Sequence, residues 1–273
     1  MLPYFSLPPI HLVGPLSLQP FGGLFAIGLL CGYLVIMRGA KADGIPPNRM
    51  QWALAWMFTI GLFTAHLAEL LFYQPDVLRR EGISAVLHVF TGLSSIGAFA
   101  GGLAALWIYS KWRRISGLTY LAIILQGFVA WWAFVRMGCA VSHDHLGTRS
   151  NFFLAVNYPA GPRHNLGLDE FLVVVLLLVP LTILCRRWHA QPKTYIATIF
   201  VAYGATRFGL EFLRATDLID ADPRYWGLTA AQYGCGVLLA AGLCMALVPR
   251  LLGTFKVMSS QAATMRLRHG ART

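Results

Sequence analysis

The sequence predicts an all-α polytopic membrane protein with seven transmembrane helices. Two observations carry this prediction. Hydrophobic residues make up 57% of the 273 residues and charged residues only 12%, whereas a soluble domain carries about 25% charged residues. Seven apolar runs are also each long enough, at roughly 20 residues, to cross a bilayer. The formal net charge is +11, and the basic residues mostly fall between the apolar runs rather than in one basic patch. No nucleic-acid partner is therefore expected.

The predicted spans follow one another without an internal repeat, which indicates one integral membrane domain over residues 1–273. In the third span, Gly97 and Gly101 are four residues apart, and such small residues permit close helix contact. The fifth span begins with Asp169 and Glu170, so we expect its outer end at the membrane interface. The spans are placed at 20–37, 51–73, 86–110, 116–135, 169–185, 195–213 and 229–252.

The basic residues of the connections predict the orientation. One set of loops, with the carboxyl-terminal tail, holds fourteen Lys and Arg residues, and the other set holds seven together with most of the acids. Because cytoplasmic loops carry the excess of Lys and Arg, we expect the amino terminus outside and the carboxyl terminus inside. The connection 136–168 is then extracytoplasmic, and the basic tail 253–273 is cytoplasmic and contacts anionic membrane lipids.

Three charged residues fall in the sixth apolar span. Arg207, Glu211 and Arg214 are spaced by four and three residues, so they share one face of a helix. Burying an isolated charge in a bilayer costs several kcal/mol, so such residues are paired or line a cavity. One interpretation is a structural ion pair. The other is a guanidinium that binds an anionic lipid headgroup, with Glu211 holding it in place, because arginine stays charged and binds phosphate through two parallel bonds.

The outer connection offers a second set of candidates. Arg136, flanked by Gly138 and Gly147, is either an interfacial arginine or part of an anion pocket lined by backbone. The triplet 143-HDH-145 has no standard zinc spacing, and no metal site is predicted. No ordered Ser–His–Asp pattern surrounds Cys139 or Ser142, so covalent catalysis by the chain itself is not expected.

Four segments resemble motifs of the prolipoprotein diacylglyceryl transferase family. The family's G-R-x-G-N-F-x-N-G-E-x-x-G signature is similar to 135-VRMGCAVSHDHLG-147, and its R-H-P-x-Q-L-Y-E stretch to 163-RHNLGLDE-170. Its Y-G-x-x-R-x-x-x-E-x-x-R helix matches 203-YGATRFGLEFLR-214 at every named position, and its Leu-Thr-x-x-Gln opening of the last span matches 228-LTAAQ-232. The resemblance covers nearly the whole chain.

The resemblance implies an activity, transfer of a diacylglyceryl group from phosphatidylglycerol to the lipobox cysteine thiol of prolipoproteins, and a location in the inner or plasma membrane of a bacterium. It implies no cofactor; the partners are phosphatidylglycerol and prolipoprotein signal peptides. The catalytic candidates are Arg136, Arg207, Glu211, Glu170 and His164. The substrate-binding candidates are Arg136, Gly138, Gly147, Arg163, Arg214, Gly101 and Gly102.

The chain also departs from the family pattern. Ala100, in 98-AFAGG-102, stands where the family commonly has a histidine, and Gly22 replaces a tyrosine. The general base therefore stays unassigned among His164, His143 and Glu170. These departures favour one alternative, a paralogue that uses the same lipid donor with another acceptor. A second alternative is a non-catalytic protein that binds or transports phospholipid and keeps the arginines only for headgroup recognition.

Overall fold

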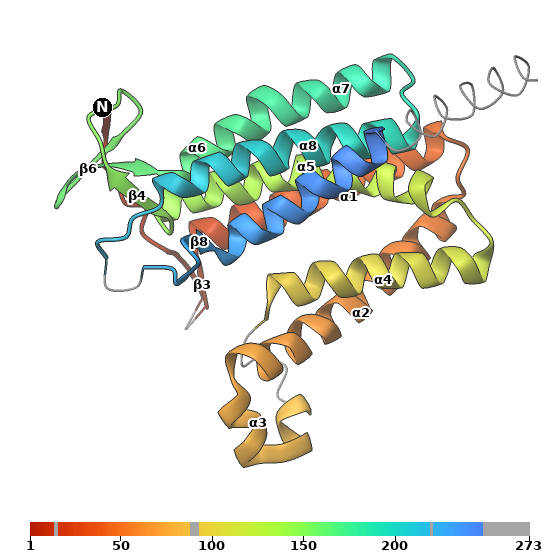
Figure 1. Ribbon diagram of the computed structural model, residues 1–273, viewed down its shortest axis with the longest axis horizontal. Helices are drawn as coiled ribbons and strands as arrows, with labels where there is room; N and C mark the ends of the chain where they lie inside the picture. Colours follow the sequence, from red (N-terminus) through yellow and green to blue (C-terminus); the bar gives the residue numbers. More distant parts are fainter. Residues whose placement is uncertain (14–15, 88–92, 219–220, 248–273) are drawn as a thin grey trace, which may run out of the picture. The chain divides into compact units, whose positions relative to one another are not determined.

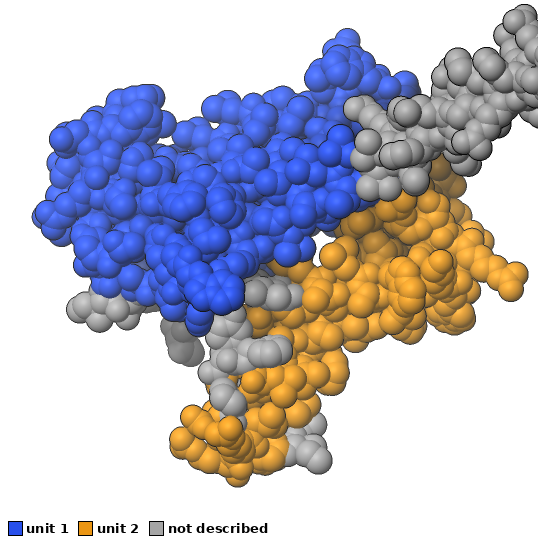
Figure 2. Space-filling view, in the orientation of Figure 1, with its two compact units in different colours: residues 1–33, 125–273 blue, residues 34–124 orange. Residues whose placement is uncertain are grey.

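The computed structural model describes residues 1–13, 16–87, 93–218 and 221–247. The chain divides into two compact units, which Figure 2 colours separately. Unit 1 is formed by Met1–Tyr33 and Leu125–Thr273, and unit 2 by Leu34–Ile124. The single integral membrane domain of the sequence analysis stays a prediction.

Unit 2 is built on two antiparallel helices, α2 (Pro47–Ala68) and α4 (Ser95–Arg113), which lie side by side in Figure 1. Proline is tolerated in a first helical turn, as at Pro47, and Ser94 caps α4 by accepting the Gly97 N–H. Along the chain, α2 is followed by the π-helical turn η1 (Glu69–Tyr73), α3 (Pro75–Glu81) and the 3-10 helix η2 (Gly82–Leu87), which all precede α4.

Small residues bring α2 and α4 together, as the sequence predicted. A Cβ atom at Gly97 would lie 2.5 Å from the carbonyl oxygen of Thr64, and one at Gly101 would overlap the Thr64 side chain. The Thr64 hydroxyl donates across the contact to the Gly97 carbonyl over 2.9 Å. Further along, Met50 and Ile123 are buried in the core of this unit.

Unit 1 holds a bundle of helices and a small sheet. The helices are the first part of α1 (Pro20–Ala42), most of α5 (Gly117–Ser142), a continuous rod of α6 (Leu166–Val173), the π-helical η3 (Val174–Leu178) and α7 (Val179–Arg187), then α8 (Pro192–Leu210), the 3-10 turn η4 (Glu211–Leu213) and a last helix, Ala230–Leu247. The rod, α5 and α8 run alongside one another in Figure 1. Glycines permit close packing: a Cβ atom at Gly204 on α8 would lie 2.9 Å from the Cys235 carbonyl oxygen.

The sheet lies at one end of the unit 1 bundle (Figure 1). Its strand order is β1 (Leu2–Pro3), β5 (Val156–Tyr158), β6 (Gly161–Asn165) and β4 (Leu146–Arg149), with β1 parallel to β5 and the other pairs antiparallel. Two short hairpins, β2 (Ile10–Val13) with β3 (Leu16–Leu18) and β7 (Arg224–Tyr225) with β8 (Leu228–Thr229), complete the described strands. This sheet, which joins three strands of the 136–168 connection to β1 of the amino-terminal segment, was not predicted from the sequence.

Six helices in the described residues are long and apolar enough to cross a membrane: Pro20–Ala42, Pro47–Leu71, Gly117–Ser142, Leu166–Arg187, Pro192–Leu213 and Ala230–Leu247. They correspond to six of the seven predicted spans. The third predicted span, 86–110, was wrong at its start, because the helix begins at Ser95 and Gly82–Leu87 is a 3-10 helix. The fourth span is longer than predicted and makes 136–142 helical. The seven-helix count and the orientation stay predictions, and the tail 253–273 lies outside the described residues.

Candidate active site

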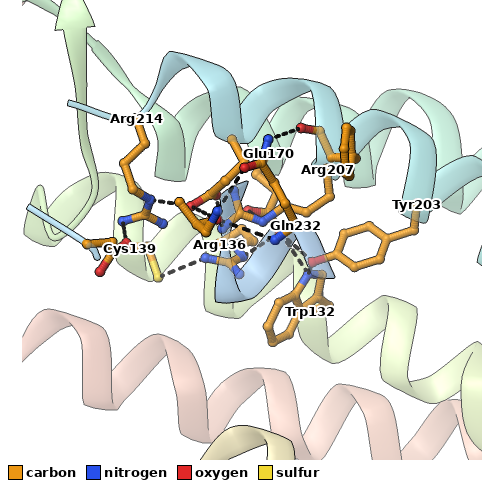
Figure 3. A network of polar contacts seen from close by, with 12 residues as sticks. Trp132, Arg136, Cys139, Glu170, Tyr203, Arg207, Arg214 and Gln232 are labelled. Carbon is orange, nitrogen blue, oxygen red and sulfur yellow. Dashed lines mark hydrogen bonds and ion pairs between the residues drawn. The ribbon is translucent and has the colours of Figure 1, made fainter. Parts of the chain in front are cut away.

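Glu170 lies at the centre of a buried polar cluster in unit 1 (Figure 3). It is positioned by the start of α6, where the Asn165 side chain accepts the Leu168 N–H and donates to the Ala140 carbonyl of α5. Gly167 allows α6 to approach α5, because a Cβ atom there would lie 2.5 Å from the Ala140 nitrogen. Because α6 lies so close to α5, Glu170, three residues after Gly167, faces α5.

Two arginines from different helices contact the two oxygens of Glu170. Arg136 Nε, on α5, lies 2.8 Å from Oε1, and Arg207 Nε, on α8, lies 3.1 Å from Oε2. The Tyr203 hydroxyl donates to Oε1 over 2.6 Å, and Trp132 Nε1 donates to the same oxygen over 3.3 Å. The Glu170 side chain is 1% exposed, so this carboxylate is stabilised entirely by partners rather than by water.

A second carboxylate, Glu211, extends the cluster along the chain. Its Oε2 lies 2.8 Å from Arg207 Nη2, and its Oε1 accepts from Arg214 Nε over 2.5 Å and from the Thr229 hydroxyl over 3.2 Å. The three charged residues of the sequence motif therefore do meet. The α-helix ends at Leu210, earlier than predicted, and a 3-10 turn carries Glu211 before Arg214 becomes extended.

Thr229 and Gln232 fix the start of the last helix and connect it to this cluster. The Thr229 hydroxyl accepts the Gln232 N–H, and the Gln232 side-chain oxygen accepts the Thr229 N–H. This reciprocal pair is a capping box. The Gln232 amide also donates to the Phe208 carbonyl of α8, so the last helix is fixed against the end of α8.

The buried part of the cluster holds more guanidinium groups than carboxylates. Three guanidinium groups, those of Arg136, Arg207 and Arg214, face two buried carboxylates, those of Glu170 and Glu211. Arg214 also contacts the half-exposed Asp222 over 2.9 Å at the outer edge. Within the described residues, Arg207 Nη1 is buried without a hydrogen-bond partner. A buried, unpaired guanidinium donor is suited to an anion.

The remaining side chains of the Arg136 region pack around it. The Arg136 guanidinium lies over the Trp132 ring, 4.4 Å from its centroid, and Nη1 donates to Cys139 Sγ over 3.9 Å. Gly138 lies against Phe21, since a Cβ atom there would be 2.9 Å from that ring. The indole and the sulfur hold the guanidinium in one orientation.

Beside the cluster, His145 follows the end of α5. Burial and the positive charges of Arg136, Arg214 and Arg207 lower the pKa of the His145 imidazole to about 4, with the charge of Glu211 opposing them. The imidazole is consequently neutral at physiological pH.

Residues 9–248 match the family model described as prolipoprotein diacylglyceryl transferase. The chain belongs to the prolipoprotein diacylglyceryl transferase family. The resemblance drawn from the sequence motifs is therefore confirmed.

Proteins named phosphatidylglycerol–prolipoprotein diacylglyceryl transferase are similar to the chain over most of its length. The one from Chloroherpeton thalassium is 22% identical over 260 residues, covering 93% of this chain and 92% of its own. The one from Tolumonas auensis is 25% identical over 251 residues, with 90% and 92% covered. The one from Pseudomonas aeruginosa strain UCBPP-PA14 is 28% identical over 260 residues, with 90% and 94% covered.

The prolipoprotein diacylglyceryl transferase motifs do not all converge on the cluster. The structure brings together Arg136, Glu170, Arg207, Glu211 and Arg214. Gly147 forms a β-bridge with Arg214, and a Cβ atom at this position would lie 2.8 Å from the Leu213 carbonyl oxygen. Gly147 therefore allows the two backbone segments to pack closely beside the cluster. Gly101 and Gly102 belong to unit 2.

Arg163 and His164, from the family's second motif, hold carboxylates of their own. Arg163 makes a bidentate pair with Asp217, lowering the pKa of that carboxyl to about 2, and donates to the Gly147 carbonyl over 3.1 Å. His164 Nδ1 lies 3.2 Å from Asp169 Oδ2. The described partners of both residues thus lie outside the arginine cluster.

Several members of the site were not predicted from the sequence. Tyr203 and Gln232 were quoted within family motifs but received no role, and Trp132 lies one turn before Arg136 in an apolar run. The capping spacing of 229-TAAQ-232 was the available signal for Thr229 and Gln232. No pattern in the sequence identified Trp132.

Proposed function

We propose that this chain transfers a diacylglyceryl group from phosphatidylglycerol to the lipobox cysteine thiol of prolipoproteins. The observation that carries the proposal is the buried Arg207 guanidinium, which contacts Glu170 and Glu211 and whose Nη1 has no partner among the described residues. A phosphodiester offers charged oxygens that such a donor binds strongly. The family and its named relatives support the same reaction.

In this reaction the thiolate of the acceptor attacks the glyceryl carbon, and the C–O bond to phosphate breaks. The electron pair of that bond goes to the phosphate oxygen, which gains charge as glycerol phosphate leaves. Fixed positive groups in a water-poor site stabilise such developing charge without having to reorganise. Arg136 and Arg207 are the proposed phosphate ligands, and Glu170 and Glu211 orient them.

The other candidates support this site in the proposal. Arg163, through Asp217 and the Gly147 carbonyl, holds the outer strands beside Arg214. His164, which lies just before α6, stays a proposed catalytic residue. Gly138 and Gly147 provide close backbone approaches. Gly101 and Gly102, which belong to unit 2, stay proposed substrate-binding residues.

The proposed setting is the inner or plasma membrane of a bacterium, with seven spans, the amino terminus outside and the carboxyl terminus inside. The six apolar helices and the family support a multi-pass membrane protein. The distribution of Lys and Arg supports the orientation.

The mass of a product tests the function. Purified protein is incubated with phosphatidylglycerol and a lipobox peptide, and in parallel with the same peptide carrying serine in place of the cysteine. A diacylglyceryl adduct on the cysteine peptide alone is expected. Glycerol phosphate released without this adduct would indicate another acceptor, the alternative favoured by Ala100 and Gly22. Lipid binding without any product, beside an active family member, would indicate a binding protein.

A further inference from the structure

The β7–β8 hairpin presents a tryptophan that lies wholly outside the fold. The two strands are antiparallel, and Trp226 and Gly227 form the two-residue turn that joins them. The Trp226 side chain is 99% exposed. Burial of large aromatic side chains contributes strongly to cores and interfaces, so an indole left entirely outside the described fold is available to a partner.

The backbone of this turn is unusual for tryptophan. The angle φ is 50° at Trp226 and 81° at Gly227, and a type I′ hairpin turn requires positive values at both positions. Asparagine or aspartate ordinarily occupies the first position, because positive φ is disfavoured for a bulky residue. The hairpin thus carries an indole where local propensity favours a small polar side chain, and backbone strain of this kind gathers at functional positions.

The hairpin is fixed to the arginine cluster at both of its ends. Two residues before β7, Asp222 Oδ2 lies 2.9 Å from Arg214 Nη1. In β8, the Thr229 hydroxyl donates to Glu211 Oε1 over 3.2 Å, and Glu211 contacts both Arg207 and Arg214. The position of the hairpin is therefore coupled to the position of these guanidinium groups.

The tip of the hairpin lies near the level at which the last apolar helix begins. Trp226 precedes the helix Ala230–Leu247 by four residues, so at about 3.6 Å per residue it lies within about 14 Å of the helix start. The Tyr233 hydroxyl of this helix donates to the Tyr225 carbonyl over 2.7 Å, and Tyr233 and Val237 are exposed one turn apart. An exposed stripe of the last helix thus continues into the hairpin.

We propose that the β7–β8 hairpin is an interfacial anchor, in which Trp226 inserts into the headgroup region of the bilayer and sets the depth of Arg207 and Arg214 relative to the lipid phosphates. The effect of this anchor on transfer rests on the proposed function. The insertion itself rests on the exposed indole, the hairpin bonds and the adjoining apolar helix.

The chemistry of the tip matches a lipid surface that contains anionic headgroups. Tryptophan is enriched at membrane–water interfaces, where the ring lies among headgroups and the indole N–H stays hydrated. Arg224 Nη1 donates across the turn to the Gly227 carbonyl over 3.4 Å, so a guanidinium that anionic lipids attract lies beside the indole. The neighbouring acid, Asp222, is paired with Arg214 and does not oppose this attraction freely.

The variant Trp226→Asn separates anchoring from folding. Asn-Gly is a favoured dipeptide for this turn, so the melting temperature of the variant should equal or exceed that of wild type while the indole is lost. In bilayers containing phosphatidylglycerol, the rate of adduct formation should fall severalfold, and Trp226→Phe, which keeps an aromatic ring, should retain most of it. In detergent micelles, whose surface adapts to the protein, both variants should match wild type.

Trp188→Asn is the matched control for this comparison. Trp188 is also a highly exposed tryptophan, at the end of α7, and no described bond connects its side chain to the arginine cluster. Its replacement should leave the rate in bilayers unchanged. An equal loss in Trp188→Asn and Trp226→Asn would overturn a specific role of the hairpin.

The depth of the tip is measured without reference to activity. Wild-type protein labelled with 5-fluorotryptophan is placed in bilayer nanodiscs of phosphatidylcholine and phosphatidylglycerol, and the fluorine signal missing from Trp226→Phe is assigned to Trp226. A nitroxide on the upper acyl chain of phosphatidylcholine should broaden this signal, and a soluble gadolinium chelate should leave it narrow.

The outcomes distinguish the anchor from the proposed function. Broadening by the soluble chelate alone, with or without acceptor peptide, would place the tip in water and overturn the anchor. Protection that appears only when a lipobox peptide is added would assign the tip to the acceptor and overturn it as well. Full activity of Trp226→Asn in bilayers would overturn the coupling of depth to transfer. An inserted tip in a wild-type protein that forms no adduct would overturn the proposed function and leave the anchor standing.

Discussion

Arg207 and Glu211 lie one helical turn apart, and the guanidinium Nη2 is 2.8 Å from the carboxylate Oε2. The carboxylate is fully buried and the guanidinium 7% exposed. The same guanidinium uses Nε to contact Glu170, which leaves only Nη1 without a partner among the described residues. Two carboxylates thus orient one arginine so that a single donor is available to a ligand.

Removal of this donor should abolish most turnover. For Arg207→Ala we expect kcat/KM to fall by at least about 10²–10³-fold, the loss seen when one donor to a developing anion is removed. Arg136→Ala should behave alike, with turnover compared at equal amounts of folded protein. The control is Arg149→Ala. This side chain is 71% exposed, and its Nε lies 3.9 Å from the half-exposed Asp217 Oδ2, away from the buried cluster. Near-normal adduct formation by Arg207→Ala would refute the phosphate-ligand role.

Glu170→Gln should destabilise the fold as well as the activity. The substitution keeps the size of the side chain but leaves two guanidiniums without a shared counter-charge, and loss of one partner from a buried ion pair costs about 3–5 kcal/mol. Tyr203→Phe, which removes one hydrogen bond to the same oxygen, should cost about 1–3 kcal/mol. Unfolding in detergent measures both. A Glu170→Gln protein as stable as wild type would show that the cluster is held by packing alone.

Gly167→Ala should separate α6 from α5. The added methyl group would lie 2.5 Å from the Ala140 nitrogen, and overpacking of this kind costs about 1–3 kcal/mol. Gly209→Ala is the matched control, since Gly209 lies on α8 with nothing near its Cβ position, and alanine there should stabilise the helix by about 0.5–1 kcal/mol. The melting temperatures of the two variants should move in opposite directions, and equal shifts would contradict the close approach at Gly167.

Acid should destabilise the protein through His145. Its pKa is about 4 in the folded state and about 6.5 when unfolded, so between these values the unfolded chain binds more protons. Stability is therefore complete above about pH 6.5 and falls as the pH drops toward 4. His145→Asn should reduce this pH dependence, measured as melting temperature from pH 7 to pH 4.5. An identical profile in wild type and variant would contradict the shifted pKa.

The orientation can be tested by labelling single cysteines. A cysteine at Ser150, in the connection predicted to be extracytoplasmic, should react with an impermeant maleimide added outside intact cells. A cysteine at Trp112, exposed at the end of α4 and predicted to be cytoplasmic, should react only after lysis. The exposed native Cys244 is replaced in both proteins. The reverse pattern would overturn the topology.

Much of the site could be predicted because its spacing is local. Arg207, Glu211 and Arg214 share a helical stripe, and a buried charged stripe requires partners. Glu170 was assigned from a family motif, but its position between Arg136 and Arg207 depends on the close packing at Gly167, a contact between segments that no local pattern encodes. Trp132 was missed for the same reason, since an indole in an apolar run has no feature that marks a polar partner.

The fold shows the same limit. Apolar length located six of the helices, because hydropathy averages over many residues. The four-stranded sheet depends on pairing between strands that are distant in sequence, such as β1 with β5. The 3-10 turn after Leu210 arises where Glu211 and Thr229 meet, and it overrides the helical periodicity of the motif.

The unpaired nitrogen of Arg207 has a consequence for how the protein is maintained in its membrane. A buried donor without a partner costs the empty protein about 1–3 kcal/mol, and an anion that binds it returns that free energy. By mass action, a ligand at 100 times its Kd adds about 2.7 kcal/mol of stability. A membrane rich in the anionic donor therefore keeps the enzyme folded as well as supplied, and depletion of that lipid lowers both turnover and abundance.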